Sequence, residues 1–245
     1  VNGKTFDKVI VTTDVAGTRK IAEQSWELLS EHPEFAGRLQ GVEPSQRYAV
    51  WRVWLDRSID HDFPGFFVCD KVDVLDSITF YRKVQDNLAA WEDETGGLVV
   101  ELHSYSIPDH ITDDAEVKRK LWAEFVHYIP GLAQAEVVHE YFQHNQNFTA
   151  FHLGLHEERP EVETPIDGLL LAGDWVKLPI PAMLMEAACS SALMASNVLL
   201  REYGLREEKL TTVPLRGLGA GLRRPPKPVK PATTGSEQPR PAARV

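Results

Sequence analysis

The sequence predicts a mixed α/β fold that combines a parallel sheet with an antiparallel one. Residues 168–173, GLLLAG, form a short apolar run between glycines, which is typical of a parallel strand buried on both faces. Residues 48–55 and 98–105, YAVWRVWL and LVVELHSY, have the alternation of half-buried strands. The chain has 245 residues, of which 43% are hydrophobic and 25% charged, and is long enough to bury such a fold without disulfides.

The elements at the start of the chain follow from local signals. Val9 to Thr12 reads as a strand after an Asn-Gly turn, and a helix is predicted from about Ala16 to Leu29. A loop is then expected through His32-Pro33 and Glu43-Pro44. In the strand from Tyr48 to Leu55, alternation divides the bulky residues between two faces, with Trp51 and Val53 on one and Arg52 and Trp54 on the other.

The middle of the chain continues this alternation of strands and helices. The aromatic loop DFPGFFV, residues 62–68, leads to a helix predicted around Leu75 to Ala90. After the strand at 98–105, Asp113-Asp114 opens a helix that runs to about Tyr128, because acidic residues favour a helix N-terminus. One or two strands are expected between Ala135 and Leu155.

The last predicted helix has Pro181 in its first turn and ends at Gly204, a common C-terminal capping residue. Its stretch 179–200 is mostly apolar and about long enough to cross a bilayer. Glu186, Asn197 and several serines within it favour a helix buried on a sheet, and its small residues suit close packing.

Charge is distributed unevenly along the chain. Residues 214–245 hold seven Lys/Arg and one Asp/Glu, whereas the whole chain has 26 and 36, so the body carries a net charge near −16 and the tail near +6. An acidic body repels phosphate backbones, which argues against a nucleic-acid partner. The basic tail could contact an anionic membrane, although such tails are usually only solvated.

The cysteines and the two ends of the chain indicate its setting. Cys69 and Cys189 are predicted to be packed free thiols, consistent with a reducing cytosol and a cytoplasmic, or peripherally membrane-bound, protein. The chain begins at Val1, almost directly with a strand, and we expect it to be the C-terminal part of a longer protein. Beyond about Leu218, clustered proline predicts a disordered tail.

A series of motifs in residues 159–200 carries the strongest functional signal. In chain order they are Arg159-Pro160, Thr164-Pro165-Ile166, Ala172-Gly173-Asp174 and Met185-Glu186-Ala187-Ala188. This series resembles the C-terminal flavin-binding segment of the FAD-containing amine oxidase and carotenoid desaturase superfamily. The segments KLPIPAMLMEAA and VPLRGL look most like those of the bacterial carotenoid ring desaturase/methyltransferases, the isorenieratene-synthase type. The resemblance covers most of the body.

The resemblance implies FAD as cofactor and an incomplete Rossmann-like FAD-binding domain with an antiparallel-sheet substrate domain inserted in it. The implied FAD-binding parts are residues 1–32 and 156–213, the substrate domain is 33–155, and the Pro/Arg-rich tail is 214–245. The nucleotide-binding Gly-x-Gly-x-x-Gly after the first strand is missing, since GLGAG at 217–221 has the wrong spacing and context. The adenine-binding half is therefore expected upstream of Val1, and the fragment alone is expected to be inactive.

The predicted cofactor site lies where the strand at 168–173 ends. Open α/β sheets bind ligands at the carboxyl ends of their strands, so Asp174 could accept hydrogen bonds from a ribityl hydroxyl, and Gly173 leaves room for the flavin. By resemblance, the backbone N–H groups of Leu184 and Met185 serve the flavin carbonyl at a helix N-terminus. The predicted site also includes Trp175, Glu186 and Thr12, although Glu186 could only cap or pair, and Thr12 and Thr13 could be an ordinary strand end.

Aromatic residues of the middle segment suggest a hydrophobic substrate. In the superfamily, antiparallel strands here wall the substrate cavity, and an apolar polyene would suit the aromatic side chains Trp51, Trp54, Phe66, Phe67 and Tyr105. Core packing is the alternative for each of them. The predicted reaction is hydride transfer from a carotenoid-like hydrocarbon to flavin N5, giving desaturation or ring aromatisation.

Ring aromatisation also needs a proton acceptor, for which Glu101, His103 and Asp56 are candidates, and no catalytic residue is assigned. The spacing of His152 and His156 does not indicate a metal site, because HLGLH reads as a strand. Two alternatives stay open: an amine oxidase-like enzyme with the same flavin segment, and a non-catalytic remnant that acts as an interaction module.

Overall fold

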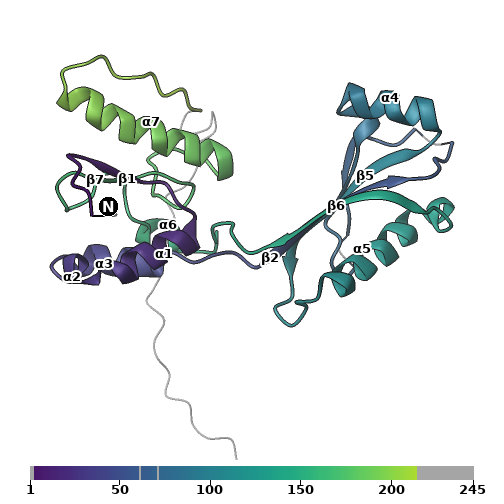
Figure 1. The fold of residues 1–245 in the computed structure, drawn as a ribbon, viewed down its shortest axis with the longest axis horizontal. Helices are drawn as coiled ribbons and strands as arrows, with labels where there is room; N and C mark the ends of the chain where they lie inside the picture. Colours follow the sequence, from purple (N-terminus) through teal and green to yellow (C-terminus); the bar gives the residue numbers. More distant parts are fainter. Residues whose placement is uncertain (1–2, 61, 71, 214–245) are drawn as a thin grey trace, which may run out of the picture.

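The computed structural model describes residues 3–60, 62–70 and 72–213, and the predicted tail at 214–245 lies outside them. These residues form two lobes, each with its own buried hydrophobic cluster (Figure 1). The first, here called the two-stranded lobe, contains β1 (Val9–Val11), α1 (Val15–Gln24), α2 (Trp26–Leu29), α3 (Pro33–Gly41), α6 (Leu155–Glu158), β7 (Leu169–Leu171) and α7 (Leu184–Glu202).

The second, the five-stranded lobe, is formed by the middle of the chain. It contains β2 (Arg47–Leu55), β3 (Phe66–Val68), β4 (Ser77–Phe80), α4 (Asp86–Thr95), β5 (Leu98–Ile107), α5 (Asp114–Tyr128) and β6 (Val137–Asn145), with short 3₁₀ turns at Tyr81–Lys83 and Pro130–Leu132. Parallel and antiparallel sheets occur in one chain, which confirms the predicted mixed α/β class.

In the two-stranded lobe, β1 and β7 pair in parallel, with Val9 opposite Leu169 and Val11 opposite Leu171. This pairing confirms the parallel strand predicted from GLLLAG, while the Rossmann-like detail stays a prediction. The predicted helix at 16–29 is interrupted at Ser25 and divides into α1 and α2. The Asp14 side chain caps α1 by accepting a hydrogen bond from the Gly17 N–H at 2.7 Å.

Helix α3 corrects the loop predicted after residue 32. Pro33 occupies the first turn of the helix, where its missing N–H costs nothing, and Phe35, Ala36 and Leu39 are buried in the cluster of the two-stranded lobe. The predicted domain boundary at 32/33 thus separates α3 from the lobe in which it packs. The domain limits stay a prediction.

The sheet of the five-stranded lobe is antiparallel, in the order β3-β4-β5-β2-β6. Central strands β2 and β5 match the strands predicted from alternation. The helix predicted from Leu75 to Ala90 is wrong over its first half, where Ser77–Phe80 forms β4 and pairs with β5. The aromatic loop at 62–68 contains a short strand, β3, that extends the same sheet.

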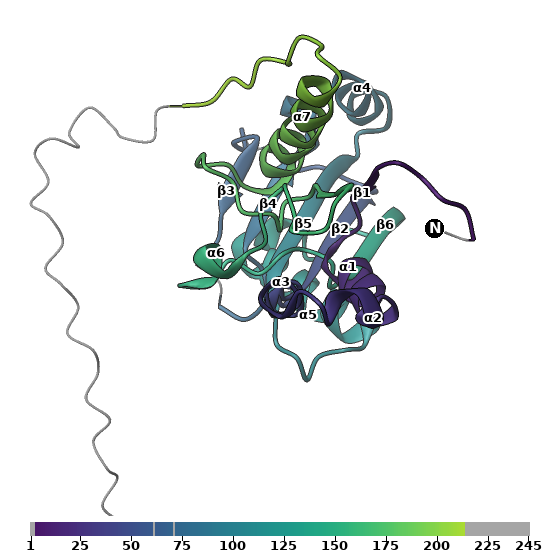
Figure 2. The same cartoon turned by 90° about the vertical axis from the view of Figure 1, so that its left-hand side faces the viewer.

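The two faces of this sheet are covered differently. Helix α5, capped by Asp113 as predicted, packs Val117, Leu121 and Phe125 onto one face. Helix α4 covers one end of the opposite face, where Leu88 packs against Val99. Figures 1 and 2 both place α4 and α7 on one side of the sheet and α5 on the other. We call the side opposite α5 the open face.

Three further expectations need correction. Pro181 lies before α7, whose first residue is Leu184. The segment 152–156 is not a strand, since residues 155–158 form α6. Cys189 is exposed, whereas Cys69 is buried as expected. Within residues 3–60, 62–70 and 72–213, no helix is long and apolar enough to cross a membrane.

Candidate functional site

The parallel pairing of β1 and β7 brings two loops to the same edge of the sheet. Thr12 and Thr13 follow β1 with exposed side chains, and Gly173 and Asp174 follow β7 at intermediate burial. Four of the residues singled out from the sequence therefore lie at the carboxyl ends of adjacent parallel strands, the usual position of ligand sites in open α/β sheets. We call this place the strand-end site.

The packing around position 173 leaves room only for glycine. A Cβ atom at this position would lie 2.4 Å from Nε1 of Trp175, closer than real contacts permit. The Gly173 N–H donates to Oγ of Ser191 at 2.8 Å, and the Ser191 hydroxyl lies 3.1 Å from the Gly173 carbonyl oxygen. Ser191 is fully buried in α7, so this contact fixes the loop after β7 to the helix.

Trp175 joins the two strand ends from inside. Its indole is completely buried, and Nε1 donates to the Thr13 carbonyl oxygen at 2.8 Å. This position gives Trp175 a supporting role at the strand-end site, because a fully buried ring has no surface to offer a cofactor.

Asp174 is held by residues from a third segment. Its Oδ1 accepts a hydrogen bond from the buried Thr149 hydroxyl at 2.8 Å, and its backbone carbonyl accepts one from Arg159 at 3.2 Å. Arg159 is itself buried and also donates to the Ala150 carbonyl oxygen at 2.7 Å. Burial lowers the pKa of Arg159, and the Asp174 carboxylate opposes that shift. The Asp174 carboxylate is thus held in a defined orientation.

The start of α7 is the remaining part of the predicted cofactor site. Leu184 has φ = +50°, which is rare outside glycine, and the N-cap Met183 makes no side-chain cap. Leu184, Met185 and Glu186 are exposed, Met185 by 81%. A helix N-terminus whose backbone N–H groups have no side-chain cap can offer them to a ligand, and strained backbone often occurs at ligand sites.

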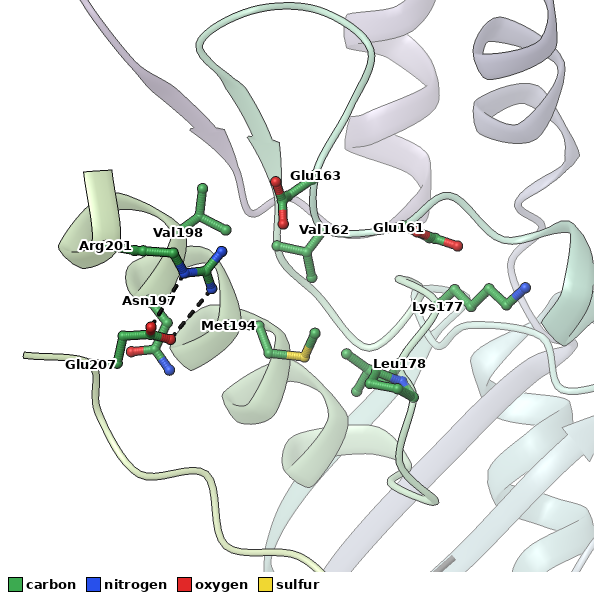
Figure 3. Close-up of a pocket in the computed structure, with 11 residues that line it drawn as sticks. Glu161, Val162, Glu163, Lys177, Leu178, Met194, Asn197, Val198, Arg201 and Glu207 are labelled. Atoms are coloured by element: carbon green, nitrogen blue, oxygen red, sulfur yellow. Dashed lines mark hydrogen bonds and ion pairs between the residues drawn. The ribbon is translucent and has the colours of Figure 1, made fainter. Parts of the chain in front are cut away.

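A separate cavity lies along the C-terminal half of α7 (Figure 3). Its volume is about 370 Å³, and its lining includes Met194, Asn197 and the ion pair between Arg201 and Glu207. None of the residues predicted from the sequence to bind cofactor lines this cavity. It is therefore distinct from the strand-end site.

The predicted substrate-wall aromatics are divided between the two faces of the five-stranded sheet. Trp51 is buried beneath α5, with Nε1 donating to Glu140 at 2.6 Å, and Phe67 packs on Phe80 in the same cluster. Trp54 and Tyr105 lie on the open face with Val99 and Glu101, as the alternation of β2 and β5 dictates. Phe66, the fifth predicted aromatic, is 53% exposed at the start of β3. The predicted side chains are therefore not brought together into one wall.

The open face carries a cluster of charged and polar side chains. Arg52 donates through Nε to Glu101 at 2.8 Å, and the Tyr81 hydroxyl donates to the same carboxylate at 3.0 Å. His103 places Nε2 3.3 Å from Glu101, and its Nδ1 lies 3.2 Å from the Tyr105 hydroxyl. Two of the three candidate proton acceptors, Glu101 and His103, are thus in contact.

Asp56, the third candidate, lies elsewhere. It pairs with Arg57 and accepts a hydrogen bond from the Glu136 N–H at 2.8 Å. These interactions, led by the Arg57 hydrogen bond, lower the pKa of Asp56 to about 2. A carboxylate with so low a pKa is a poor proton acceptor at neutral pH.

Comparison with known proteins matches one family over most of the chain. The family model described as "Flavin containing amine oxidoreductase" matches residues 1–200, which include both lobes. The chain belongs to this flavin-containing family. Membership agrees with the superfamily resemblance seen in residues 159–200.

Two curated relatives of this family member are named carotenoid phi-ring synthase. The one from Chlorobaculum tepidum is 38% identical over 216 residues, which cover 87% of this chain and 33% of that protein. The one from Streptomyces griseus is 30% identical over 220 residues, covering 89% of this chain and 42% of that protein. The chain therefore spans only about a third to two-fifths of these relatives.

The fold also resembles that of one solved structure. The crystal structure of an oxidoreductase from Methanosarcina mazei superposes with a TM-score of 0.52 and 18% identity, covering 79% of this chain and 43% of that one. At this identity the likeness concerns the fold alone.

Sequence reasoning missed the residues that support the strand-end site. Arg159 was part of a recognised motif but had no assigned role, and Thr149 and Ser191 carried no signal for one. Their contacts depend on how distant segments pack, since Thr149 and Asp174 are 25 positions apart in the sequence and Gly173 and Ser191 are 18 apart. A local pattern cannot show such pairs.

Proposed function

We propose that this chain is part of an FAD-dependent oxidoreductase that acts on a hydrophobic, carotenoid-like polyene by desaturation or ring aromatisation. The observation that carries the proposal is the strand-end site, where Gly173 and Asp174 follow β7 and Gly173 is hydrogen-bonded to Ser191 of α7, in a member of a flavin-containing family. The two relatives named carotenoid phi-ring synthase support the substrate class.

The donor set at the strand-end site fits the flavin half of FAD. Asp174 supplies a carboxylate of which Oδ1 is oriented by Thr149, suitable for a ribityl hydroxyl. The exposed start of α7, with Leu184 and Met185, supplies N–H groups and the positive end of a helix dipole for the polar edge of the flavin ring. Bound FAD would supply the acceptor for a hydride.

The residues around this site then have supporting tasks. Trp175 and Ser191 hold the loop after β7 against β1 and α7, and Arg159 fixes the backbone at Asp174. Such a rigid edge orients a cofactor without covalent chemistry of its own. Because polyenes partition into bilayers, the proposal includes peripheral contact with a membrane.

Removing the Asp174 carboxylate tests the cofactor assignment. In the native gene product, Asp174→Ala should weaken FAD binding about 10- to 100-fold, since a hydrogen bond to a charged group contributes roughly 1.5–3 kcal/mol. The measurement is the flavin absorbance that stays with the protein through gel filtration, together with a titration of apoprotein with FAD.

Asp167→Ala is the matched control. Asp167 is an exposed aspartate at the opposite end of β7, so its loss should leave flavin retention unchanged. Equal retention in Asp174→Ala and the native protein would overturn the assignment of Asp174. A native protein that takes up no flavin would overturn the proposed function.

A further inference from the structure

The open face of the five-stranded lobe contains a connected chain of three titratable side chains on one strand. Glu101, His103 and Tyr105 alternate along β5 and therefore point to the same side. We propose that they form a proton relay, with Tyr105 as the group that meets the substrate, and that this relay accepts the proton lost from a substrate carbon. The inference rests on the proposed function, which supplies the oxidation.

The relay is continuous in its geometry. The Tyr105 hydroxyl lies 3.2 Å from Nδ1 of His103, and the two rings are near-parallel with centroids 5.7 Å apart. On the other side of the imidazole, Nε2 lies 3.3 Å from Glu101 Oε1 and 3.2 Å from the Thr79 hydroxyl. With Nε2–H donating to Glu101, Nδ1 is left as the acceptor for Tyr105.

The inner end of the relay is fixed by its neighbours. Arg52 binds Glu101 Oε2 through Nε at 2.8 Å and Nη2 at 2.7 Å, and its guanidinium also stacks on the Tyr81 ring, 4.0 Å from the centroid. Tyr81 donates to Oε1 of the same carboxylate. Glu101 is only 7% exposed, so its orientation toward His103 is set by packing on all sides.

The outer end is accessible. Tyr105 is 48% exposed, whereas Glu101 and His103 lie beneath it with little exposed surface. Helix α4 covers only the part of the open face around Val99 and Tyr81, and Figures 1 and 2 place α7 on the same side of the sheet. Of the three relay side chains, Tyr105 is therefore the one that a substrate on the open face can reach.

The protonation states suit proton uptake. Burial, aided by Arg52, lowers the pKa of His103 below its ordinary value of 6.5, so the imidazole is neutral at neutral pH. Burial also raises the pKa of Tyr105, which keeps its hydroxyl protonated. Glu101 favours the charged imidazolium and stabilises it once a proton arrives. Arrangements of carboxylate, imidazole and hydroxyl recur in general-base chemistry.

The balance of the reaction requires such an acceptor. Making a carbon–carbon double bond removes one hydrogen as a hydride, with both electrons of its bond, and a second as a proton. The electrons of the second C–H bond form the double bond as its proton binds to the Tyr105 oxygen. The phenolic hydrogen moves in the same step to Nδ1 of His103, which becomes an imidazolium opposite Glu101.

Tyr105→Phe removes the first member of the relay and keeps the ring. In the flavin-loaded native protein with β-carotene in detergent micelles as probe, we expect product formation to fall about 100-fold or more, because general acid–base catalysis typically contributes 10²–10⁴-fold. Substrate affinity should stay within about twofold, since only a hydroxyl is lost. Single-turnover kinetics separates binding from product formation.

Tyr141→Phe is the matched control. Tyr141 is exposed on the same face of the sheet, but its hydroxyl accepts a hydrogen bond from Gln143, outside the relay. Product formation should be unchanged in this variant. Unchanged turnover in Tyr105→Phe, or an equal loss in both variants, would overturn the relay.

The pH dependence gives a readout that a merely structural role would not move. Because the imidazole must be neutral, turnover in the native protein should fall as the pH drops through the pKa of His103, which is below 6.5. In His103→Gln this decrease in turnover at low pH should be absent. Of the charged and titratable groups near the imidazole, Glu101 and Tyr105 contact it directly. Arg52 and Tyr81 bind Glu101, and the Asp76 carboxylate accepts a hydrogen bond from the Tyr105 backbone N–H.

NMR of the imidazole nitrogens tests the geometry without turnover. In the native protein His103 should titrate below 6.5 with Nδ1 unprotonated, and in Tyr105→Phe the Nδ1 shift should change while the backbone spectrum is retained. A protonated Nδ1 in the neutral ring would contradict the relay.

The failures of the two proposals differ. If β-carotene does not reduce the bound flavin of the native protein under anaerobic conditions, the proposed function fails and the relay with it. If it does, and Tyr105→Phe forms product at the native rate, only the relay fails.

Discussion

The two lobes present their functional groups in different ways. In the two-stranded lobe the strand-end site consists mainly of backbone and one carboxylate. Buried Ser191 and Trp175 hold the loops after β7 and β1, and Thr149 orients the Asp174 carboxylate. In the five-stranded lobe the functional groups are side chains on a sheet face. This difference suits a division of labour in which one lobe orients a cofactor and the other contacts substrate.

The lobes also differ in how completely they bury apolar surface. The sheet of the two-stranded lobe has only two strands of three residues. Phe6, just before β1, is 56% exposed, and Ile10, within β1, is 37% exposed. In the five-stranded lobe, α5 covers one face of the sheet, and the buried cluster between them includes Phe125 and Leu121. The five-stranded lobe is therefore expected to be the more stable unit.

The largest effect is expected from breaking the core under α5. Phe125 is fully buried and packs near Trp122, with ring centroids 5.5 Å apart. Phe125→Ala should lower the free energy of unfolding by about 3–5 kcal/mol, as large-to-small core substitutions do. Urea unfolding followed by tryptophan fluorescence measures it.

Leu39→Ala is the counterpart in the other lobe, where Leu39 is 5% exposed within the cluster that includes α3. It should destabilise by about 2–5 kcal/mol. If the lobes unfold as separate units, each variant shifts one transition only. A common shift of a single transition in both variants would show that the comparison between independent lobes is wrong.

The elements that could be predicted from the sequence are those whose signal is local. The alternation of β2, the buried run of β7 and the Asp113 cap of α5 all depend on neighbouring residues. Strand β4 was missed because Leu75 and Ile78 have helical spacing, and only pairing with β5 decides for a strand.

The candidate sites show the same limit. Gly173 and Asp174 could be found because they follow a recognisable strand. The spacing of Glu101, His103 and Tyr105 was visible as alternation, but the contacts of Arg52 and Tyr81 with Glu101 depend on the register of β2 with β5 and on the turn after β4. A long-range register cannot be read from a single strand.

A smaller effect is expected at Gly173. In Gly173→Ala the new Cβ would meet the Trp175 indole, so the ring must shift away from its hydrogen bond to Thr13. We expect a loss of about 1–3 kcal/mol in stability, as for other overpacked sites, and weaker flavin retention. Thermal unfolding and flavin absorbance after gel filtration measure the two effects.

Gly37→Ala serves as the control for this variant. Gly37 lies in α3 of the same lobe, and a Cβ there would meet nothing within 4 Å. Alanine should therefore stabilise by about 0.4–1 kcal/mol through the unfolded state. If both variants gave the same change, the tight packing around Gly173 would not be what holds the strand-end site.

The smallest effect sharpens the comparison without changing stability, because each lobe has one cysteine. Cys69 is buried in the five-stranded lobe, and burial, aided by Glu124, raises its pKa to about 11, while Cys189 is exposed on α7. Since the thiolate is the reactive form, a disulfide reagent at pH 8 should modify Cys189 at least about 100-fold faster than Cys69. Cys189→Ser, which should remove the fast phase, assigns it. The slow modification of Cys69 would then report how often the five-stranded lobe opens. If Cys69 reacted as fast as Cys189, this lobe would open so readily that its core could not have the stability inferred above.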